Sequence, residues 1–327
     1  MELLPDFEVI RPANVEEAAR KGALEHARFI SGGTDLMPNL RRGLDAPQIL
    51  VDLSCIAELR QIEKTKDGLR VGAGVTLQQL ISDPYIQTEY KVIADTVTEI
   101  AGTTHRSSAT VGGNLCLDTR CQFYNQSEWW RSTNGYCLKY RGDICHVANK
   151  SEVCRASYNG DLAPMMLLHD AQVELLSAEG GRRSIALRDL YQEDGAAHLL
   201  LRPGELLVSV ILKKLDGYRS AYRKVRVRGG IDFPLVGVAM AIRGSGAHLD
   251  DVRIALTGTN SRPIILEGTA ELANKRMDAA TLKLLIKLVR SQSKPVHSTF
   301  TPGQYRSKVV VNVARRMVRD LLGMEII

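Results

Sequence analysis

The chain has 327 residues, 44% of them hydrophobic and 24% charged, which is the composition of a soluble globular protein with two or three domains. The formal net charge is +6, and Lys and Arg are spread along the chain rather than gathered in one block. The longest apolar run, residues 234–242, is too short to cross a bilayer, and the first residues lack the basic and apolar regions of a secretory leader. We therefore expect a cytoplasmic protein without a membrane partner.

The first 55 residues alternate between strand and helix patterns and are expected to form an N-terminal subdomain. Asn14 is a candidate N-cap for a short helix through Ala19. The expected order is strand 7–12, helix to Ala19, strand 27–31, a glycine turn and helix within 32–43, and a buried strand 48–54. Such a βαβ beginning is typical of a cofactor-binding α/β domain.

Residues 56–177 are expected to form a second subdomain. Alternating segments at 59–64 and 68–74 predict a hairpin around the turn at 65–68. The segments 76–83, 90–102 and 160–171 have helical spacing, and 172–178 reads as a strand. Between them, residues 119–158 have no sustained period, which predicts a long loop, and long loops in compact proteins are usually functional or disordered.

Residues 178–327 are expected to form a C-terminal α+β domain. Strands are predicted at 205–212, 220–227, 235–243 and 251–258, followed by helices at 278–291 and 304–322. A three- or four-stranded antiparallel sheet with helices on one face is the simplest arrangement.

Two basic clusters, Arg223–Arg228 and residues 306–319, allow a nucleic-acid face as one interpretation. The favoured interpretation is that they are solvated edges of a strand and a helix, because no helix-turn-helix, zinc-finger or ribonucleoprotein signature accompanies them.

Two glycine loops are candidate phosphate sites. Phe29–Leu36 has the order strand, glycine turn, helix, in which backbone N–H groups can point at a phosphate, and Thr34 adds a hydroxyl. Thr110–Leu115 repeats a hydroxyl, two glycines and an amide side chain. Either loop alone is weak evidence for a phosphate site, since paired glycines usually mark a tight turn. Together the two loops suggest one pyrophosphate held from both sides. Val71–Leu77 has the first two glycines of a Rossmann fingerprint but not the third, and it reads as a hairpin or a strand end. No Walker lysine is present.

Four of the six cysteines, Cys121, Cys137, Cys145 and Cys154, lie in the predicted loop, separated by fifteen, seven and eight residues. No close C-x2-C pair is present, which disfavours structural zinc, and disulfides need an oxidising compartment. The spacing favours an iron–sulfur cluster, with zinc, disulfides and unligated thiols as alternatives. His146 is a conceivable ligand, although a solvent-facing or hydrogen-bonded role is favoured.

Cys55 and Cys116 stand apart from this group. For Cys55, directly after a strand, a small buried side chain is expected.

Taken with the two glycine loops, five blocks resemble the FAD-binding subunit of the xanthine oxidase family of molybdenum hydroxylases. These blocks are "SGGTDL", "AGTTHRSSATVGGNL", "GDLAPMMLLHDAQVEL", "RPGELLVSVIL" and "YRKVRVRGGIDFPLVGVAM". The resemblance covers nearly the whole chain. It implies a vanillyl-alcohol-oxidase-type FAD fold in two α/β subdomains, followed by a C-terminal domain like that of the CO dehydrogenase flavoprotein.

Family members lack the stretch between "GGNLCLDT" and "YNGDLAP". The insertion 119–158 looks like the one in the flavin subunit of 4-hydroxybenzoyl-CoA reductase, which carries a 4Fe-4S cluster. The resemblance therefore implies that Cys121, Cys137, Cys145 and Cys154 ligate such a cluster.

The resemblance also implies flavin contacts. Residues matching the family's pyrophosphate loops are Phe29, Ile30, Ser31, Gly32, Gly33, Thr34, Asp35 and Leu36, with Thr110, Val111, Gly112, Gly113 and Asn114. Asp161 matches an aspartate on the ribityl or adenosine side, while Leu207 and Lys224 match contacts near the flavin. Ile100 stands where some members have an aromatic residue, so the packing on the flavin ring departs from theirs.

The implied function is an electron relay between FAD and a 4Fe-4S cluster, with no catalytic residue on this chain. Implied partners are a molybdopterin-binding large subunit, a small subunit with two 2Fe-2S clusters, and a reduced ferredoxin as donor, in a complex that dehydroxylates 4-hydroxybenzoyl-CoA in anaerobic aromatic degradation. One alternative is a self-contained FAD-dependent oxidoreductase. The other is a zinc-stabilised module that binds nucleic acid.

Overall fold

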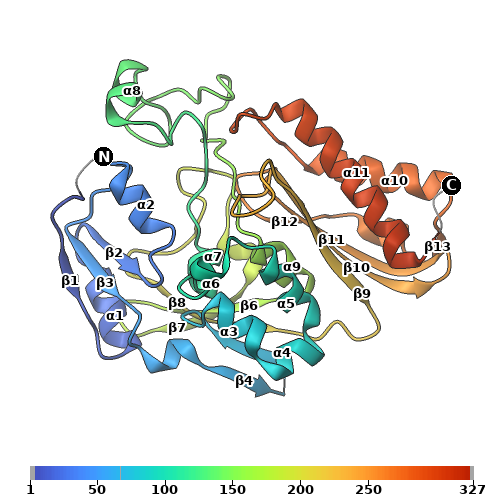
Figure 1. Ribbon diagram of the computed structural model, residues 1–327, viewed down its shortest axis with the longest axis horizontal. Coiled ribbons are helices and arrows are strands. Elements are labelled where there is room, and N and C mark those ends of the chain that lie inside the picture. Colours follow the sequence, from blue (N-terminus) through green and yellow to red (C-terminus); the bar gives the residue numbers. More distant parts are fainter. Residues whose placement is uncertain (1–3, 67, 325–327) are drawn as a thin grey trace.

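Three short parallel strands build the N-terminal part of the computed structural model, which describes residues 4–66 and 68–324. The strands β1 (Glu8–Ile10), β2 (Ala27–Ile30) and β3 (Ile49–Asp52) pair in the order β1-β3-β2 (Figure 1). The connecting helices are α1 (Val15–Gly22) and α2 (Leu36–Arg41). Asn14 caps α1 by accepting a hydrogen bond from Glu17 N at 2.9 Å. The predicted βαβ beginning is confirmed.

A five-stranded antiparallel sheet follows, in the order β4-β5-β8-β6-β7. Its strands are β4 (Ile62–Thr65), β5 (Gly68–Gly72), β6 (Gln172–Leu176), β7 (Arg182–Ala186) and β8 (Leu206–Leu212). The hairpin β4-β5 confirms the prediction; Asp67 of its turn lies outside the described residues. The assignment of residues 205–212 to the C-terminal sheet was wrong, because β8 pairs with β5 and β6. The boundary expected at residue 178 falls inside this sheet, and we place it between β8 and β9.

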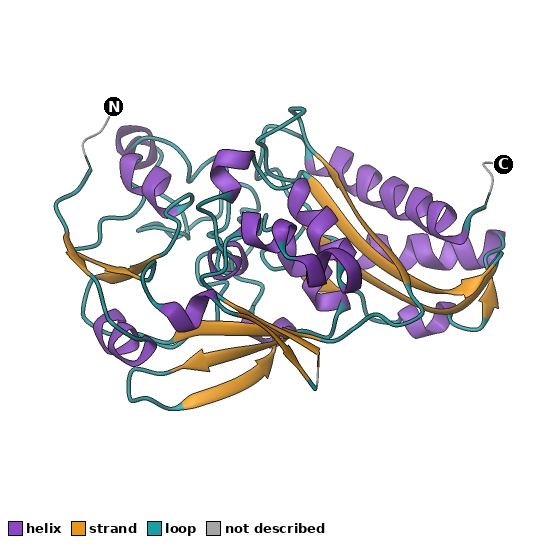
Figure 2. Ribbon diagram, turned by 60° about the horizontal axis from the view of Figure 1, so that its bottom comes forward, coloured by secondary structure: helices purple, strands orange, loops and turns teal. Residues whose placement is uncertain are grey.

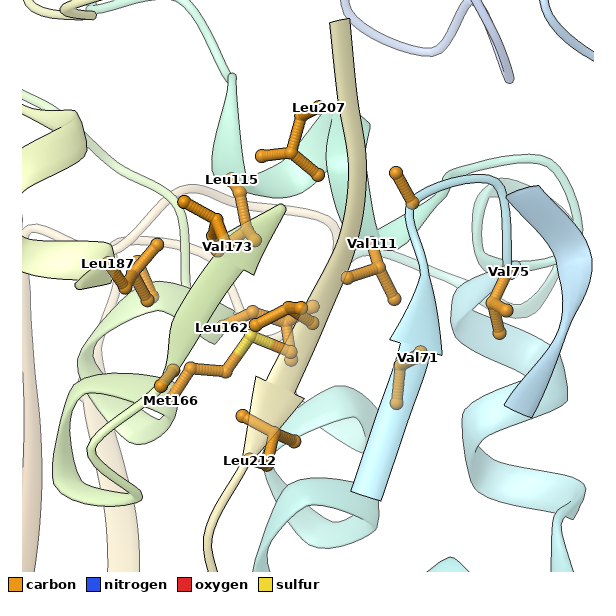
Figure 3. Close-up of a cluster of buried hydrophobic side chains, with 14 of the residues drawn as sticks. Val71, Val75, Val111, Leu115, Leu162, Met166, Val173, Leu187, Leu207 and Leu212 are labelled. Atoms are coloured by element: carbon orange, nitrogen blue, oxygen red, sulfur yellow. The ribbon is translucent and has the colours of Figure 1, made fainter. Parts of the chain in front are cut away.

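Short helices cover one side of this sheet. They are α3 (Leu77–Ser82), α4 (Pro84–Glu89), α5 (Lys91–Thr98), α6 (Thr103–Arg106), α7 (Val111–Leu115) and α9 (Leu162–Leu168), with 3-10 turns η1 (Ala57–Arg60) and η2 (Leu187–Leu190). All seven residues of α9 are buried, as expected of a helix that is apolar on every side. Figure 3 shows Leu162 and Met166 of α9 among Val173, Leu207 and Leu212 of the sheet and Val111 and Leu115 of α7.

The C-terminal sheet runs β12-β11-β10-β9, with β13 paired to β11. Its strands are β9 (Arg219–Val225), β10 (Val236–Ser245), β11 (His248–Thr257), β12 (Ile264–Ile265) and β13 (Lys275–Arg276). The 3-10 turn η3 (Thr269–Leu272) and the helices α10 (Ala279–Gln292) and α11 (Gly303–Leu322) complete the chain (Figure 2). Consecutive residues of a strand point to opposite faces. Large residues of β10 such as Met240 pack toward α10 and α11, while Ala239 and Ala241 pack toward the core that contains α9.

The segment 119–158 forms a lobe that rises beside α2, with α8 (Glu128–Thr133) as its one described helix (Figure 1). Its small core comprises Leu44, Cys121, Tyr124, Cys154 and Ala156. Arg131 is buried there, donates to Gly43 O at 2.7 Å, and lies over the rings of Tyr124 and Tyr140. The lobe is therefore ordered against the N-terminal part of the chain.

Candidate functional site

A cavity of about 1120 Å³ lies where the N-terminal sheet, the second sheet and the lobe meet. Most residues proposed from the sequence for the flavin line it: Phe29, Ile30, Ser31, Gly32, Gly33, Thr34, Asp35, Leu36, Ile100, Thr110, Gly112, Gly113, Asn114, Asp161 and Leu207. Val111 and Lys224 are not among the lining residues. Val111 is buried in the core, and Lys224 lies behind Asp161.

The first glycine loop offers hydrogen-bond donors to the cavity. The amides of Gly32 to Leu36 have no acceptor within the described residues, whereas Met37 N already donates to Gly33 O. Gly33 has a left-handed backbone with φ +67°, and a Cβ on Gly32 would lie 1.9 Å from Ser108 O. Glycine at both positions therefore brings several free N–H groups to the cavity wall, as an anionic group requires.

The second glycine loop contributes shape rather than amide donors. It forms helix α7, in which Thr110 Oγ1 accepts from Gly113 N at 3.2 Å and Asn114 Oδ1 accepts from Leu162 N at 3.1 Å. Gly112 N donates to Ala73 O, and a Cβ at Gly112 would lie 2.8 Å from Ala73 Cβ. The glycines thus let α7 lie against the strand end without filling the cavity.

A buried ion pair closes the base of the cavity. Asp161 Oδ2 lies 3.2 Å from Lys224 Nζ, and Asp161 Oδ1 accepts from Tyr222 OH at 2.6 Å. Burial raises the pKa of Asp161, while the Lys224 ammonium and the Tyr222 hydroxyl counter this rise. Asp161 lines the cavity, whereas Lys224 contacts Asp161 without lining the cavity itself.

The edge of the cavity near Ile100 was only partly expected. Ile100 lines the wall next to Ala101, whose φ is +47°, and Arg106 Nη1 donates to Ile100 O at 2.8 Å. His105, Ile231 and Phe233 also line the cavity and were missed. The block "YRKVRVRGGIDFPLVGVAM" contained two of them, but no periodic pattern marks which side of a loop faces inward.

The four thiols of the lobe lie in one environment. All six cysteines fall in the described part of the chain and none forms a disulfide; Cys121, Cys145 and Cys154 are buried and Cys137 is half-buried. Burial raises the pKa of Cys154 to about 12, and nearby Cys145 and Cys121 contribute to the rise. Burial likewise raises the pKa of Cys121, and Cys137 and Cys145 add to it. The four sulfurs are thus electrostatic neighbours.

The arrangement of the sulfurs does not suit a single ion. Among residues 4–66 and 68–324, no group of three or more His, Cys, Asp or Glu side chains is close enough to hold one. His146 Nε2 lies 2.6 Å from Tyr136 O and its ring stacks on Phe123, in agreement with a hydrogen-bonded role. Two expectations outside the lobe fail. Cys55 is exposed rather than buried, because it lies in the turn after β3, and Arg306 of the basic cluster 306–319 is fully buried.

The lobe meets the cavity directly. Lys139, Tyr140 and Arg141 belong to the cavity wall, and Arg120 at the start of the lobe pairs with Asp35 of the first glycine loop. In the part of the chain that the structure describes, no helix has the length and apolarity needed to span a membrane.

Comparison with known proteins gives the same two-part division. Residues 5–213 match the family of the FAD binding domain in molybdopterin dehydrogenase, and residues 220–321 match the CO dehydrogenase flavoprotein C-terminal domain. The aldehyde oxidoreductase FAD-binding subunit PaoB of Escherichia coli is 36% identical over 250 residues, covering 74% of this chain and 77% of that protein. The carbon monoxide dehydrogenase medium chain of Afipia carboxidovorans is 26% identical and covers 95% of both chains.

Solved structures agree on the fold. CO dehydrogenase from Oligotropha carboxidovorans has a TM-score of 0.79 at 25% identity, covering 99% of this chain and 100% of that one. Quinoline 2-oxidoreductase from Pseudomonas putida 86 has a TM-score of 0.77 at 22% identity, with 98% of each chain covered.

Proposed function

This chain belongs to the FAD-binding medium subunits of the xanthine oxidase and CO dehydrogenase class of molybdenum hydroxylases, and we propose that it is the flavin and iron–sulfur subunit of a 4-hydroxybenzoyl-CoA reductase-type complex. The chain is thus a subunit of an oxidoreductase. The substrate site belongs to a partner subunit in this proposal. The partners are a molybdopterin-binding large subunit and a small subunit with two 2Fe-2S clusters, as the sequence resemblance implies.

The observation that carries the proposal is the set of four neighbouring thiols in the lobe that borders the cavity. Cysteine thiolates are the usual ligands of iron–sulfur clusters. Among residues 4–66 and 68–324, no group of three or more His, Cys, Asp or Glu side chains could hold a single ion, which disfavours zinc. Four thiols suit a cluster in which each iron takes one cysteine. Ala156 N also donates to Cys154 Sγ at 3.4 Å, the type of N–H···S contact that tunes such clusters.

The FAD-binding residues are proposed from the cavity. The free amides of the loop Gly32–Leu36 suit the pyrophosphate, and α7 with Thr110 and Asn114 bounds the same space. Asp161, oriented by Lys224 and Tyr222, is suited to accept from a ribityl or ribose hydroxyl. Ile100 and Leu207 supply apolar surface for the ring system.

When bound, FAD supplies exchange between two-electron and one-electron chemistry, and the cluster supplies one-electron transfer. In this proposal the chain would hold FAD in the cavity and the cluster in the lobe that borders it. A reduced ferredoxin is the proposed donor. The Arg131 and Lys139 side chains are buried, so the exposed charge of the lobe reduces to Arg141 and Lys150 against Glu128, Asp143 and Glu152. Electrostatic steering at the lobe is therefore expected to be weak.

The experiment replaces Cys137 with Ser, and a matched Cys55→Ser variant controls for the loss of a thiol outside the lobe. Cys137→Ser should lose iron, labile sulfide and ferredoxin-driven turnover of the complex, while FAD stays bound, because Cys137 is not a cavity residue. Cys55→Ser should retain all of them, since Cys55 is exposed and outside the lobe.

Two results would overturn the proposal. Full iron and sulfide in Cys137→Ser would remove this residue from the ligand set. Unchanged ferredoxin-driven turnover in a variant that has lost the cluster would exclude the proposed electron route.

A further inference from the structure

Lys139 is the buried cation between the thiols and the flavin cavity. It follows Cys137 by two residues, yet its side chain is only 5% exposed. The chain turns inward at this point, and Lys139 contributes to the cavity wall with its neighbours Tyr140 and Arg141. A lysine in a polar loop is ordinarily a solvated residue, so its burial requires specific partners.

The ammonium of Lys139 is held by three acceptors from two other segments. Nζ donates to Asp118 Oδ1 at 2.7 Å, to Thr119 Oγ1 at 2.5 Å and to Gly195 O at 3.0 Å. The Tyr124 ring lies on another side, with its centroid 5.1 Å from Nζ. All three protons of the ammonium thus have an acceptor, which fixes the position of the charge.

The Lys139 ammonium also lies near the thiols of the lobe. Tyr124, whose ring faces the ammonium, packs with Cys121 and Cys154 in the small core of the lobe. Cys154 is also linked to the acceptors of Lys139, because Gly195 N donates to Cys154 O at 2.8 Å. The ammonium therefore lies near the thiols on one side and borders the cavity on the other.

Two other buried cations of the lobe also have carboxylate partners. Arg131 forms an ion pair with Glu128 and lies over two aromatic rings, and Arg120 is paired with Asp35. Lys139 has Asp118 as its carboxylate partner, and this carboxylate is 37% exposed. Water screens Asp118 more than it screens the buried ammonium, so the carboxylate offsets the charge of Lys139 only in part.

We propose that Lys139 is a positioning residue that raises the reduction potential of the thiolate-bound cluster and holds the lobe against the flavin cavity. The inference rests on the proposed cluster. Reduction adds a negative charge to a cluster that is already anionic, so a fixed cation nearby favours the reduced form. The ion pair with Asp118 sets how much of that cation the cluster experiences.

The test is a redox titration of the full complex, followed by the electron paramagnetic resonance signal of the reduced cluster, with iron, sulfide and FAD measured in every variant. Lys139→Met should shift the midpoint potential downward. Asp118→Asn should shift it upward, because the ammonium loses its counter-charge but keeps its other acceptors. Lys150→Met removes an exposed lysine of the same lobe and should leave the potential unchanged, since water screens that charge.

The opposite signs separate an electrostatic role from a structural one. A merely structural Lys139 predicts loss of cluster or FAD without a shift, or shifts of the same sign in both variants, and either result overturns the inference. If Lys139→Met does not accumulate as a folded protein, Asp118→Asn decides: an upward shift supports the inference and an unchanged or lower potential overturns it. Absence of labile sulfide in the unaltered complex would instead defeat the proposed function itself.

Discussion

Gly32 is the residue at which the first glycine loop touches the backbone of Ser108. A Cβ at this position would lie 1.9 Å from Ser108 O, so the loop must move away from that carbonyl. We predict that Gly32→Ala weakens FAD binding at least about tenfold, because a loss of about 1.4 kcal/mol in binding free energy is sufficient for this change. Fluorescence titration of the FAD-free chain measures this.

The matched control for Gly32 is Gly181→Ala. A Cβ at Gly181 meets only the Ser177 hydroxyl, at an ordinary 3.4 Å, in a turn far along the chain. FAD affinity should not change. Equal affinities of the Gly32 and Gly181 variants would contradict the assignment of the first loop to the flavin.

His169 makes stability depend on pH. Its Nδ1 lies 2.7 Å from Lys213 O, which can only accept, so Nδ1 carries the proton, and Nε2 is buried without a partner among the described residues. Burial lowers the pKa of His169 to about 4, against 6.5 in the unfolded chain. Between these values the unfolded chain binds a proton that the folded chain does not. His169 therefore does not lower the free energy of unfolding above pH 6.5. Below this value the free energy of unfolding falls as the pH drops, by about 3 kcal/mol at pH 4.

The measurement compares thermal unfolding midpoints at pH 7 and pH 4.5. His169→Asn keeps a donor for Lys213 O without a titrating ring, so its midpoint should fall less than that of the unaltered chain. His26→Asn changes an exposed histidine and should behave like the unaltered chain. A fall of the same size in all three would show that His169 does not titrate as described.

At the scale of elements, strand β10 illustrates what the sequence predicts well. Its apolar run indicated a buried strand, and the structure explains the choice of side chains: bulky residues face α10 and α11, and alanines face the other core. Strand β8 shows what the sequence does not predict. Residues 206–210 are all buried, so no alternation reveals which sheet it joins, and only the pairing with β5 and β6 decides.

Arg306 joins elements that are distant in sequence. It donates to Leu235 O before β10 at 3.0 Å and to Val296 O before α11 at 3.0 Å, and it also bonds Gly258 O. In the sequence, Arg306 belongs to a basic cluster that reads as the solvated edge of a helix. Its burial comes from contacts with segments distant in the sequence, which the local pattern does not reveal.

We predict that Arg306→Met lowers stability by about 3 kcal/mol or more, since several buried carbonyls lose their donor. Arg306→Lys should restore only part of this loss, because one ammonium does not reproduce the planar guanidinium. Thermal unfolding of the FAD-bound chain checks both, with the exposed Arg316→Met as control. Arg306→Met with an unfolding midpoint equal to that of the control would contradict the role.

For the whole molecule, the motifs predicted from sequence converge on one cavity, since both glycine loops, Ile100, Asp161 and Leu207 line it. What the sequence did not predict depends on long-range packing. Lys139 reads as an ordinary loop lysine until Asp118, Thr119 and Gly195 are brought around it by the fold. The same holds for the burial of the lobe's thiols, because a polar segment signals neither its core nor its contact with residues 43–44.

The central claim is that one chain carries both a flavin and a cluster held by the lobe's four thiols. The most direct measurement is the visible spectrum of the full-length chain, prepared without oxygen, together with its flavin, iron, sulfide and zinc content. The account predicts flavin bands over a broad iron–sulfur shoulder, with iron and labile sulfide matching one 4Fe-4S cluster per FAD. Flavin without labile sulfide, or with a single zinc ion in its place, would contradict it.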